Sequence, residues 1–247
     1  MNINMDIIKC KDEDEMSRRA ASLVAEAIHR DPHSILGLAT GSSPVGMYKN
    51  LVKFYEQGTL DFSKVRSFNL DEYYPIQPED PQSYRHFMNE NLFDHINIDP
   101  ANTHVPQGNA EDPEAVCEAY DLMIQAAGGI DLQILGIGNN GHIAFNEPAD
   151  HFPAGTHLVD LQESTIKANA RFFASEADVP RQAISMGIGS ILRAKRIILL
   201  ASGEAKAEAV KACVEGPITP FCPASALQLH PDVTIFVDEA AAKLLSK

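Results

Sequence analysis

The sequence has 247 residues, of which 45% are hydrophobic and 22% charged. A chain of this size and composition buries a sizeable apolar core without cross-links, which excludes a mainly disordered or low-complexity protein. Its formal net charge of −14 makes it a poor general binder of nucleic acid or of anionic membranes, so a site for an anionic ligand would need its own local cations.

The chain has four cysteines, Cys10, Cys117, Cys213 and Cys222, and no pair has metal-binding or redox C-x-x-C spacing. We expect free, mostly buried thiols in a reducing cytoplasm. The first residues lack the pattern of a signal peptide, and no apolar stretch approaches the ~18 residues that a membrane helix needs. The sequence therefore predicts a cytoplasmic protein.

The first half of the chain alternates short apolar runs with amphipathic segments. Asp12 and Glu15 form a capping box that predicts a helix start. In chain order, the pattern predicts a strand at Met5–Cys10, a helix to about Ile28, a strand at Ser34–Ala39, a turn at Thr40–Gly46 opening a helix that ends near Gly58, a strand at Val65–Leu70, a proline-rich loop at Asp71–Pro81 and a helix at Tyr84–Ile96.

The second half continues the alternation: a helix at Pro113–Ala127, a strand at Ile130–Ile137, a glycine-rich loop at Gly138–Pro148, a helix at Ala183–Leu192, a strand at Lys195–Ala201, a helix at Glu204–Val214, a strand at Val233–Val237 and a helix at Glu239–Leu245. This order predicts one α/β domain over residues 1–247, doubly wound around a mainly parallel sheet with helices on both faces. The more polar residues 150–178 are expected to form a lid. In such folds ligands bind beyond the carboxyl ends of the strands.

Two loops that follow predicted strands carry small or acidic residues. Gly41, Ser42 and Ser43 open a helix, and their backbone N–H groups are suited to a phosphate, although an ordinary strand-to-helix turn has the same composition. Asp71 and Glu72 follow the next strand. Adjacent residues in extended chain point to opposite sides, so one carboxylate can enter a site while the other points away; a solvated acidic loop is the alternative.

The third loop, at residues 136–148, carries the sharpest chemical pattern. Three glycines permit a tight backbone after a buried strand. His142 then comes two residues after Asn140 and five before Glu147. A histidine held by a carboxylate serves as a proton shuttle, because its unperturbed pKa is near ~6.5. The alternative is a histidine hydrogen-bonded in a turn. The other histidines show no metal-ligand spacing, so no metal is expected.

These loops together resemble the glucosamine-6-phosphate deaminase (glucosamine-6-phosphate isomerase) family. The resemblance runs along nearly the whole chain, through the motifs TGSSP, FNLDEYY, SYRHFM, GIGNNGHIAFNEP, ARFF, SGEAKA and SALQLHPDVTIFVDEAA. It implies a fold shared with ribose-5-phosphate isomerase and 6-phosphogluconolactonase. It also implies conversion of glucosamine 6-phosphate and water to fructose 6-phosphate and ammonia, without metal or organic cofactor.

The resemblance assigns roles to individual residues. Asp71 matches the base that moves a proton from C2 to C1 of the open-chain sugar. His142 matches the ring-opening acid and base, with Asn140 and Glu147 as its polar partners. The phosphate site matches Gly41, Ser42 and Ser43 together with two cations, Arg171 and Lys206, each of which by itself is more often a surface charge.

The chain departs from parts of the family at a few positions. Position 140 is Asn where a well-known branch has Asp, which is a variation between branches. His157 and Val159 stand where the allosterically activated branch has an arginine and a lysine, so we expect no activation by N-acetylglucosamine 6-phosphate.

The sequence leaves three alternative functions. The first is a deaminase for galactosamine 6-phosphate, a sugar that differs from glucosamine 6-phosphate only at C4, and no motif indicates which configuration at C4 is bound. A 6-phosphogluconolactonase is disfavoured by Tyr73 and by the FNEP continuation at residues 145–148. A non-catalytic sugar-phosphate sensor is disfavoured because the reactive residues are all present. The sequence does not determine the oligomeric state and is compatible with a homo-oligomer.

Overall fold

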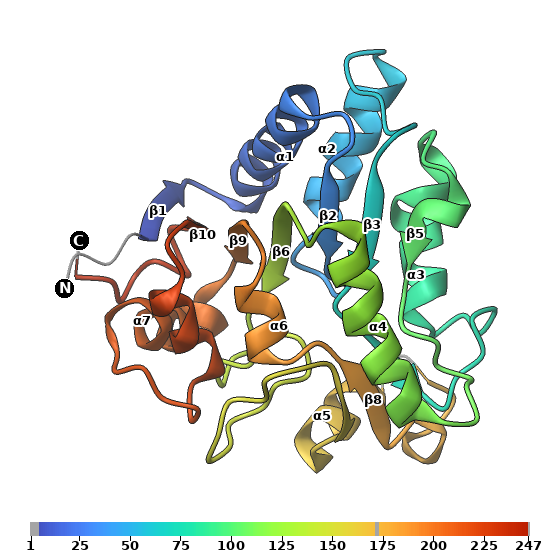
Figure 1. Cartoon of the computed structure of the whole chain (residues 1–247). Coiled ribbons are helices and arrows are strands. Elements are labelled where there is room, and N and C mark those ends of the chain that lie inside the picture. The colour runs from blue at the N-terminus through green and yellow to red at the C-terminus, as the bar shows by residue number, and fades with distance from the viewer. Residues whose placement is uncertain (1–4, 171–172, 247) are drawn as a thin grey trace.

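The computed structural model describes residues 5–170 and 173–246. Its centre is a seven-stranded sheet in which every neighbouring pair is parallel, in the order β1-β10-β9-β6-β2-β3-β5 (Figure 1). The predicted doubly wound α/β fold is therefore confirmed. The strands are β1 (Met5–Cys10), β2 (Ile35–Leu38), β3 (Arg66–Asn69), β5 (Thr103–His104), β6 (Leu132–Gly136), β9 (Arg196–Ala201) and β10 (Val233–Asp238).

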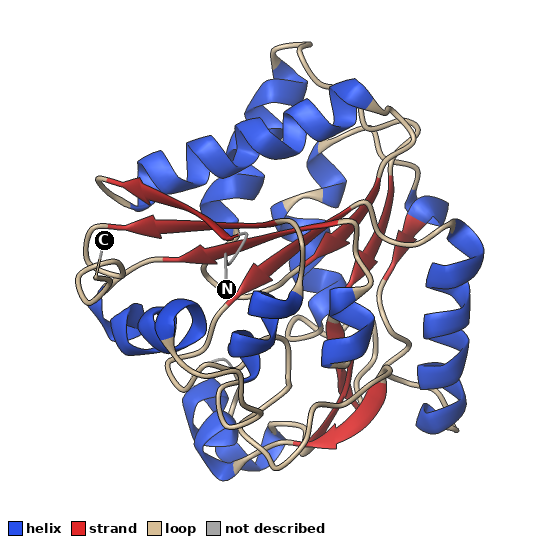
Figure 2. Cartoon of the chain, turned by 60° about the vertical axis from the view of Figure 1, so that its left-hand side comes forward, coloured by secondary structure: helices blue, strands red, loops and turns tan. Residues whose placement is uncertain are grey.

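Helices cover both faces of this sheet, as Figure 2 shows. Helices α1 and α2 pack against each other on one face, while α4, α6 and α7 lie on the other (Figure 1). None of the described helices is long and apolar enough to cross a membrane. The helices are α1 (Glu13–Arg30), α2 (Val45–Glu56), α3 (Tyr84–Asn91), α4 (Pro113–Ala127), α5 (Glu163–Asn169), α6 (Ile188–Leu192) and α7 (Ala207–Glu215), with 3₁₀ turns at Phe93–His95, Pro100–Asn102, Glu176–Asp178, Glu204–Lys206 and Pro223–Leu229.

The first helix begins at the capping box that the sequence predicts. The Asp12 carboxylate accepts a hydrogen bond from the Glu15 N–H at 2.9 Å, and the Glu15 carboxylate accepts one from the Lys11 N–H at 2.8 Å. These bonds satisfy backbone donors that the first turn of a helix leaves without partners. Helix α4 ends at Gly128, whose φ of 104° is a left-handed conformation that glycine adopts without strain.

A second, smaller sheet lies beyond the carboxyl ends of the large one. It contains β4 (Asp71–Tyr74), β8 (Gln182–Ser185) and β7 (His157–Asp160), paired antiparallel in the order β4-β8-β7. In the view of Figure 1, β8 and α5 lie below the large sheet. Because β4 follows β3 after a single residue, the small sheet is held directly against the strand ends where a ligand is expected.

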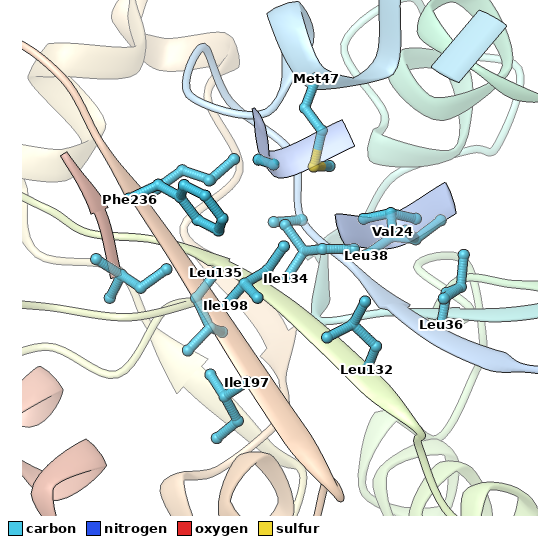
Figure 3. Packing of buried hydrophobic residues seen from close by; sticks show 14 of the residues in the cluster. Val24, Leu36, Leu38, Met47, Leu132, Ile134, Leu135, Ile197, Ile198 and Phe236 are labelled. Atoms are coloured by element: carbon cyan, nitrogen blue, oxygen red, sulfur yellow. The ribbon is translucent and has the colours of Figure 1, made fainter. Parts of the chain in front are cut away.

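Two hydrophobic clusters stabilise the fold. The main core lies between the large sheet and its helices: Val24 of α1 and Met47 of α2 pack over Leu38, Ile134 and other strand residues (Figure 3). The second cluster lies under the small sheet and contains Tyr73, Ile76, Phe145, Leu161, Ile166, Val179 and Ala183. All four cysteines are buried and free, as expected.

Three segments differ from the sequence-based prediction. The start of the proline-rich segment, expected as loop, is strand β4, because its backbone pairs with β8 and the prolines begin only at residue 75. The segment Ala183–Leu192, expected as one helix, is the end of β8 followed by the short helix α6. Here pairing with strands on both sides overrides local propensity.

The last expected helix, Glu239–Leu245, is a run of turns. The Ala241 N–H bonds to the Asp238 carboxylate instead of extending a helical ladder. The segment 150–178, expected to form a lid, includes strand β7 and helix α5.

Candidate active site

A cavity of about 610 Å³ opens at the carboxyl ends of β2, β3 and β6. From β2 the chain continues to β3 and β5 on one side, whereas β6, β9 and β10 lie on the other. Such a reversal of strand order is where open α/β sheets bind ligands. The cavity is lined by residues 39–43, Leu70, Asp71, Tyr84, residues 136–140, His142, Ala144, Phe145, Glu147, Thr165 and Lys206.

One wall of the cavity is the turn between β2 and α2. Gly41 takes a φ of 88°, which side chains disfavour, and so lets the turn bend tightly into the helix. Helix α2 has Pro44 as its N-cap residue, and no described side chain accepts a hydrogen bond from its first turn as a cap. Backbone N–H groups at an uncapped helix start attract anions. Gly41, Ser42 and Ser43 all face the cavity at this point.

Lys206 brings a positive charge to the same cavity. It follows the turn after β9, where the Gly203 N–H bonds to both oxygens of the buried Asp238 carboxylate, at 3.1 and 2.9 Å. Burial lowers the pKa of Lys206, and no carboxylate of residues 5–170 or 173–246 offsets that effect. A half-buried ammonium group without an acidic partner is suited to bind an anion.

Asp71 and Glu72 separate to opposite sides of β4, as the sequence predicts for adjacent residues. Asp71 lines the cavity, although only 6% of its surface is exposed. Glu72 points away, and its carboxylate accepts hydrogen bonds from the backbone N–H groups of Tyr73, Tyr84 and Arg85 at 2.8–3.0 Å. Glu72 thus caps the start of α3, while Asp71 keeps its carboxylate for a ligand.

The surroundings of Asp71 favour its protonated form. Burial first, and the negative charge of Glu72 second, raise the pKa of Asp71 to about 8. Burial likewise raises the pKa of Glu72 to about 7, although its three backbone donors act in the opposite direction. A carboxyl group whose pKa is near neutrality exchanges protons readily at physiological pH.

His142, Asn140 and Glu147 form a closed set of contacts on the glycine-rich loop. The His142 Nδ1 lies 2.8 Å from the Asn140 Oδ1 and 3.4 Å from the Glu147 Oε1. The Asn140 Nδ2 in turn donates to the Glu147 Oε2 at 2.6 Å. Each of the three side chains therefore orients the other two.

These contacts determine which nitrogen of His142 carries the proton. Since the Asn140 amide nitrogen donates to Glu147, its oxygen faces His142 and accepts a hydrogen bond. The Nδ1 of His142 must then be the donor, which leaves Nε2 as the basic nitrogen of the neutral ring. Glu147 supplies the negative charge that Asn140 lacks.

A tight turn brings Glu147 back toward His142. The Asn146 N–H bonds to the Ile143 carbonyl at 3.1 Å, and Ala144 has a φ of 51°, which is unusual for a residue with a side chain. The Asn146 side-chain amide donates to the carbonyls of Ile143 and Met186. This turn is therefore fixed from two sides, and strained backbone of this kind often accompanies a functional site.

Glu147 is half-buried but stays ionised. Burial opposes its ionisation, but the hydrogen bonds and charge of His142, together with hydrogen bonds from Asn140 and Thr165, outweigh burial and lower the pKa of Glu147. The Thr165 hydroxyl donates to the Glu147 Oε1 at 3.0 Å. Asp71 and Glu147 thus differ in the direction of their pKa shifts, as expected for groups with different roles.

Eight of the nine predicted site residues line this one cavity: Gly41, Ser42, Ser43, Asp71, Asn140, His142, Glu147 and Lys206. Arg171 lies outside the described residues. The sequence-based reasoning missed Tyr84, Phe145 and Thr165 as cavity residues. Tyr84 and Phe145 lie within two of the family motifs, SYRHFM and GIGNNGHIAFNEP, and those motifs could have predicted them as site residues. No local sequence pattern indicates that Thr165 lies in the cavity.

No three His, Cys, Asp or Glu side chains converge as a metal site requires, within the part of the chain that the structure describes. The expectation that no metal or cofactor takes part stays a prediction.

Comparison with known proteins identifies the family. The family model described as glucosamine-6-phosphate isomerases/6-phosphogluconolactonase matches residues 11–236. The chain belongs to this family. Among curated members, the glucosamine-6-phosphate deaminase of Clostridioides difficile (strain 630) is 59% identical over 98% of this chain and 97% of its own. The deaminase of Halothermothrix orenii is 58% identical over 94% of this chain and 96% of its own.

Solved structures of the family agree with the fold. A structure described as a monomeric glucosamine-6-phosphate deaminase is 46% identical and superposes with a TM-score of 0.94, covering 97% of this chain and 100% of that one. The 6-phosphogluconolactonase of Trypanosoma brucei superposes with a TM-score of 0.74 at 19% identity, over 98% of each chain. The second likeness shows a shared fold and nothing more.

Proposed function

We propose that the chain catalyses the conversion of glucosamine 6-phosphate and water to fructose 6-phosphate and ammonia. One observation carries the proposal: two groups of different character that can transfer protons, Asp71 and His142, face the same cavity as a turn suited to bind an anion. Lys206, which has no carboxylate partner among the described residues, faces this cavity as well. The names of relatives that are 58–60% identical over nearly their whole length support the same activity.

The phosphate group binds where the local positive potential is strongest. The N–H groups and hydroxyls of Gly41–Ser43 and the ammonium of Lys206 hold it, with Arg171 as a further cation. These donors offset the overall charge of −14, which otherwise repels a dianion. Binding at the phosphate fixes the sugar so that its C1–C2 bond lies near Asp71.

His142 opens the pyranose ring. Its Nε2 takes the proton of the C1 hydroxyl and returns a proton to the ring oxygen as the C1–O bond breaks, giving the open-chain aldehyde. Asn140 keeps the ring in the required tautomer, and Glu147 stabilises the imidazolium that forms in between. A positioned acid or base of this kind typically accelerates a reaction ~10²–10⁴-fold.

Asp71 then carries a proton along the sugar. Its carboxylate removes the proton from C2, which the neighbouring carbonyl makes acidic, and the carbonyl oxygen at C1 gains a proton as the enolamine forms. Asp71 then returns the proton to C1 while the amino nitrogen gives one up, so that the product is the 2-imine of the ketose. Water adds to C2 of this imine and ammonia leaves, which gives fructose 6-phosphate. No electrons are gained or lost overall, so the reaction needs no redox cofactor.

The proposal includes a cover over the site and a single catalytic domain. Residues 150–178 contain α5, which contributes Thr165 to the cavity lining. The buried Leu161 and Ile166 attach this segment to the second hydrophobic cluster. We assign residues 150–178 as the lid of one domain spanning the chain.

Ammonia release tests the proposal. The purified protein is incubated separately with glucosamine 6-phosphate and with galactosamine 6-phosphate, and ammonia and ketose phosphate are measured. We expect turnover of the gluco sugar and a loss of at least ~10²-fold in Asp71→Asn, with binding of the sugar phosphate retained. Wild-type protein that releases no ammonia from the gluco sugar contradicts the proposal, and release from the galacto epimer alone reassigns the substrate.

A further inference from the structure

Thr165 is the one contact from helix α5 to the histidine–carboxylate set that the described residues show. It lies in the first turn of α5, and its hydroxyl donates to the Glu147 Oε1 at 3.0 Å. Eighteen residues separate the two in sequence, and they belong to different elements. Nothing in the reaction proposed above uses this hydroxyl directly.

The hydroxyl completes the coordination of Glu147. One carboxylate oxygen, Oε2, accepts from Asn140 at 2.6 Å. The other, Oε1, accepts from Thr165 and faces the His142 Nδ1 at 3.4 Å. With a donor at each oxygen, the plane of the carboxylate is fixed. Without Thr165, the carboxylate is free to rotate about its last bond, and among the described residues the His142 Nδ1 is the one remaining donor to Oε1.

Packing determines where Thr165 lies. The adjacent Ile166 is buried in the cluster that contains Tyr73 and Phe145. Tyr73 follows Asp71 and Glu72 on β4, while Phe145 lies between His142 and Glu147 on the glycine-rich loop. The cluster therefore joins both reactive loops to α5, and the Thr165 hydroxyl reaches Glu147 only when α5 is seated on it.

We propose that Thr165 is a positioning residue for the ring-opening step, whose hydroxyl holds Glu147 against His142 and makes this contact depend on the seating of α5. The inference rests on the proposed deaminase function. It also gives the lid segment a chemical role: besides covering the cavity, it supplies one of the hydrogen bonds that keep Glu147 ionised.

Two substitutions separate the hydroxyl from the shape of the side chain. Thr165→Val keeps the shape and removes the donor, while Thr165→Ser keeps the donor and removes a methyl group. We expect kcat of Thr165→Val to fall about tenfold or more, the usual effect of losing a hydrogen bond to a charged group. KM should change little, because Thr165 does not bind the phosphate. Thr165→Ser should keep kcat within about threefold of the wild type, since its donor remains.

The pH profile provides a readout that a purely structural role would not move. Loss of a donor to the ionised carboxylate raises the pKa of Glu147. Because Asp71 titrates at higher pH, Glu147 contributes the more acidic of two inflections in the acidic limb of kcat. That inflection should move to higher pH in Thr165→Val and stay in place in Thr165→Ser. Glu163→Gln, an exposed change on the same helix, is the matched control and should leave both kcat and the pH profile unchanged. Thermal unfolding of every variant verifies that it is folded.

Each remaining outcome overturns the inference. A folded Thr165→Val with wild-type kcat and an unmoved acidic limb shows that the hydroxyl is dispensable. If kcat falls in both Thr165→Val and Thr165→Ser and the pH profile does not change, Thr165 has a packing role instead. If Thr165→Val does not fold, a Thr165→Ser variant with low kcat is sufficient to contradict the inference. All of these leave the proposed function intact, which fails only if the wild type releases no ammonia.

Discussion

Asp71 and Glu72 are consecutive residues of β4, yet only one of the two carboxylates is available to a ligand. Glu72 accepts hydrogen bonds from the Tyr73 N–H on β4 and from two backbone N–H groups at the start of α3, whereas Asp71 lines the cavity. Glu72 also acts on its neighbour, because its negative charge contributes to the raised pKa of Asp71. The pair thus combines stabilisation of a helix start with a shift in the pKa of a carboxyl group that lines the cavity.

Removing the charge of Glu72 should change the pH dependence of catalysis. In Glu72→Gln the negative charge beside Asp71 is gone, so the pKa of Asp71 falls and its carboxylate forms at lower pH. The limb of kcat/KM that rises with pH should therefore move to lower pH. Glu79→Gln removes an exposed carboxylate from the same segment and serves as the control. An unmoved limb in a folded Glu72→Gln variant would show that the two carboxylates are not coupled.

Asp71 should destabilise the fold as the pH rises. Its pKa is about 8 in the folded chain against an ordinary value of 3.8, so between these pH values the folded state binds more protons than the unfolded state. The free energy of unfolding then decreases with increasing pH, by at most about 1.4 kcal/mol per pH unit for this group. Asp71→Asn lacks this contribution.

Urea unfolding of the wild type and of Asp71→Asn at pH 5 and pH 7.5 checks this expectation. The stability of the variant relative to the wild type should increase between the two pH values. Parallel changes in both proteins would mean that Asp71 has an ordinary pKa in the folded chain.

Lys206 should distinguish phosphorylated from unphosphorylated sugars. Loss of one charge-assisted contact costs roughly 1.5–3 kcal/mol, or about 10- to 150-fold in affinity. We expect Lys206→Ala to weaken binding of glucosamine 6-phosphate by this factor and to leave binding of glucosamine unchanged. Lys211→Ala removes the same charge from an exposed position of α7 and controls for the overall field. Equal losses for both ligands would assign Lys206 to another role.

An alanine at Gly141 should destabilise the protein more than an alanine at Gly58, a glycine of similar backbone conformation. At Gly58, with a φ of 69°, an added Cβ meets no described atom within 4 Å, whereas at Gly141, with a φ of 85°, it comes 2.6 Å from the Cys222 Sγ. Both alanine variants incur about 1–2 kcal/mol for left-handed backbone. Gly141→Ala should lose a further ~1–3 kcal/mol from overpacking and reduce activity by shifting His142.

Urea unfolding of Gly58→Ala, Gly141→Ala and the double variant Gly141→Ala/Cys222→Ala separates these contributions. The double variant should recover part of the stability that Gly141→Ala loses, since the sulfur is gone. If the two single variants unfold at the same urea concentration, Cys222 does not restrict the loop.

The chain should not respond to N-acetylglucosamine 6-phosphate. His157 stands at one of the positions where the activated branch has a cation, and burial lowers its pKa, so it is neutral near pH 7.5. An effector that binds both states equally shifts no equilibrium. Initial rates against substrate should be hyperbolic with and without millimolar effector. A sigmoidal curve that becomes hyperbolic on addition would contradict this prediction.

The large sheet was predictable because its strands are continuous apolar runs between turn signals, as at Ile130–Ile137. The small sheet was not. Strands β4 and β8 are four residues each, and β4 carries two carboxylates, so no local pattern distinguishes them from loop or helix. Their pairing is a tertiary effect between segments about 110 residues apart.

The same distinction separates the site residues. Asp71, His142 and Glu147 follow predicted strands of the large sheet, and their position after those strands is readable from the sequence. The opposite orientation of Asp71 and Glu72 follows from the alternation of extended chain. Thr165 reaches the site only because Ile166 packs against residues from two other segments. No periodicity within α5 contains that information.

The position of Asp71 between the two hydrophobic clusters has a consequence for heat inactivation. Leu70, immediately before it, belongs to the main core, while Tyr73, two residues after it, belongs to the smaller cluster that also holds α5. Asp71 thus lies between two hydrophobic clusters of unequal size, and we expect the cluster with fewer buried side chains to loosen first on warming. Activity should then disappear while the seven-stranded sheet is still intact, so the temperature limit of catalysis belongs to the small sheet and not to the fold as a whole.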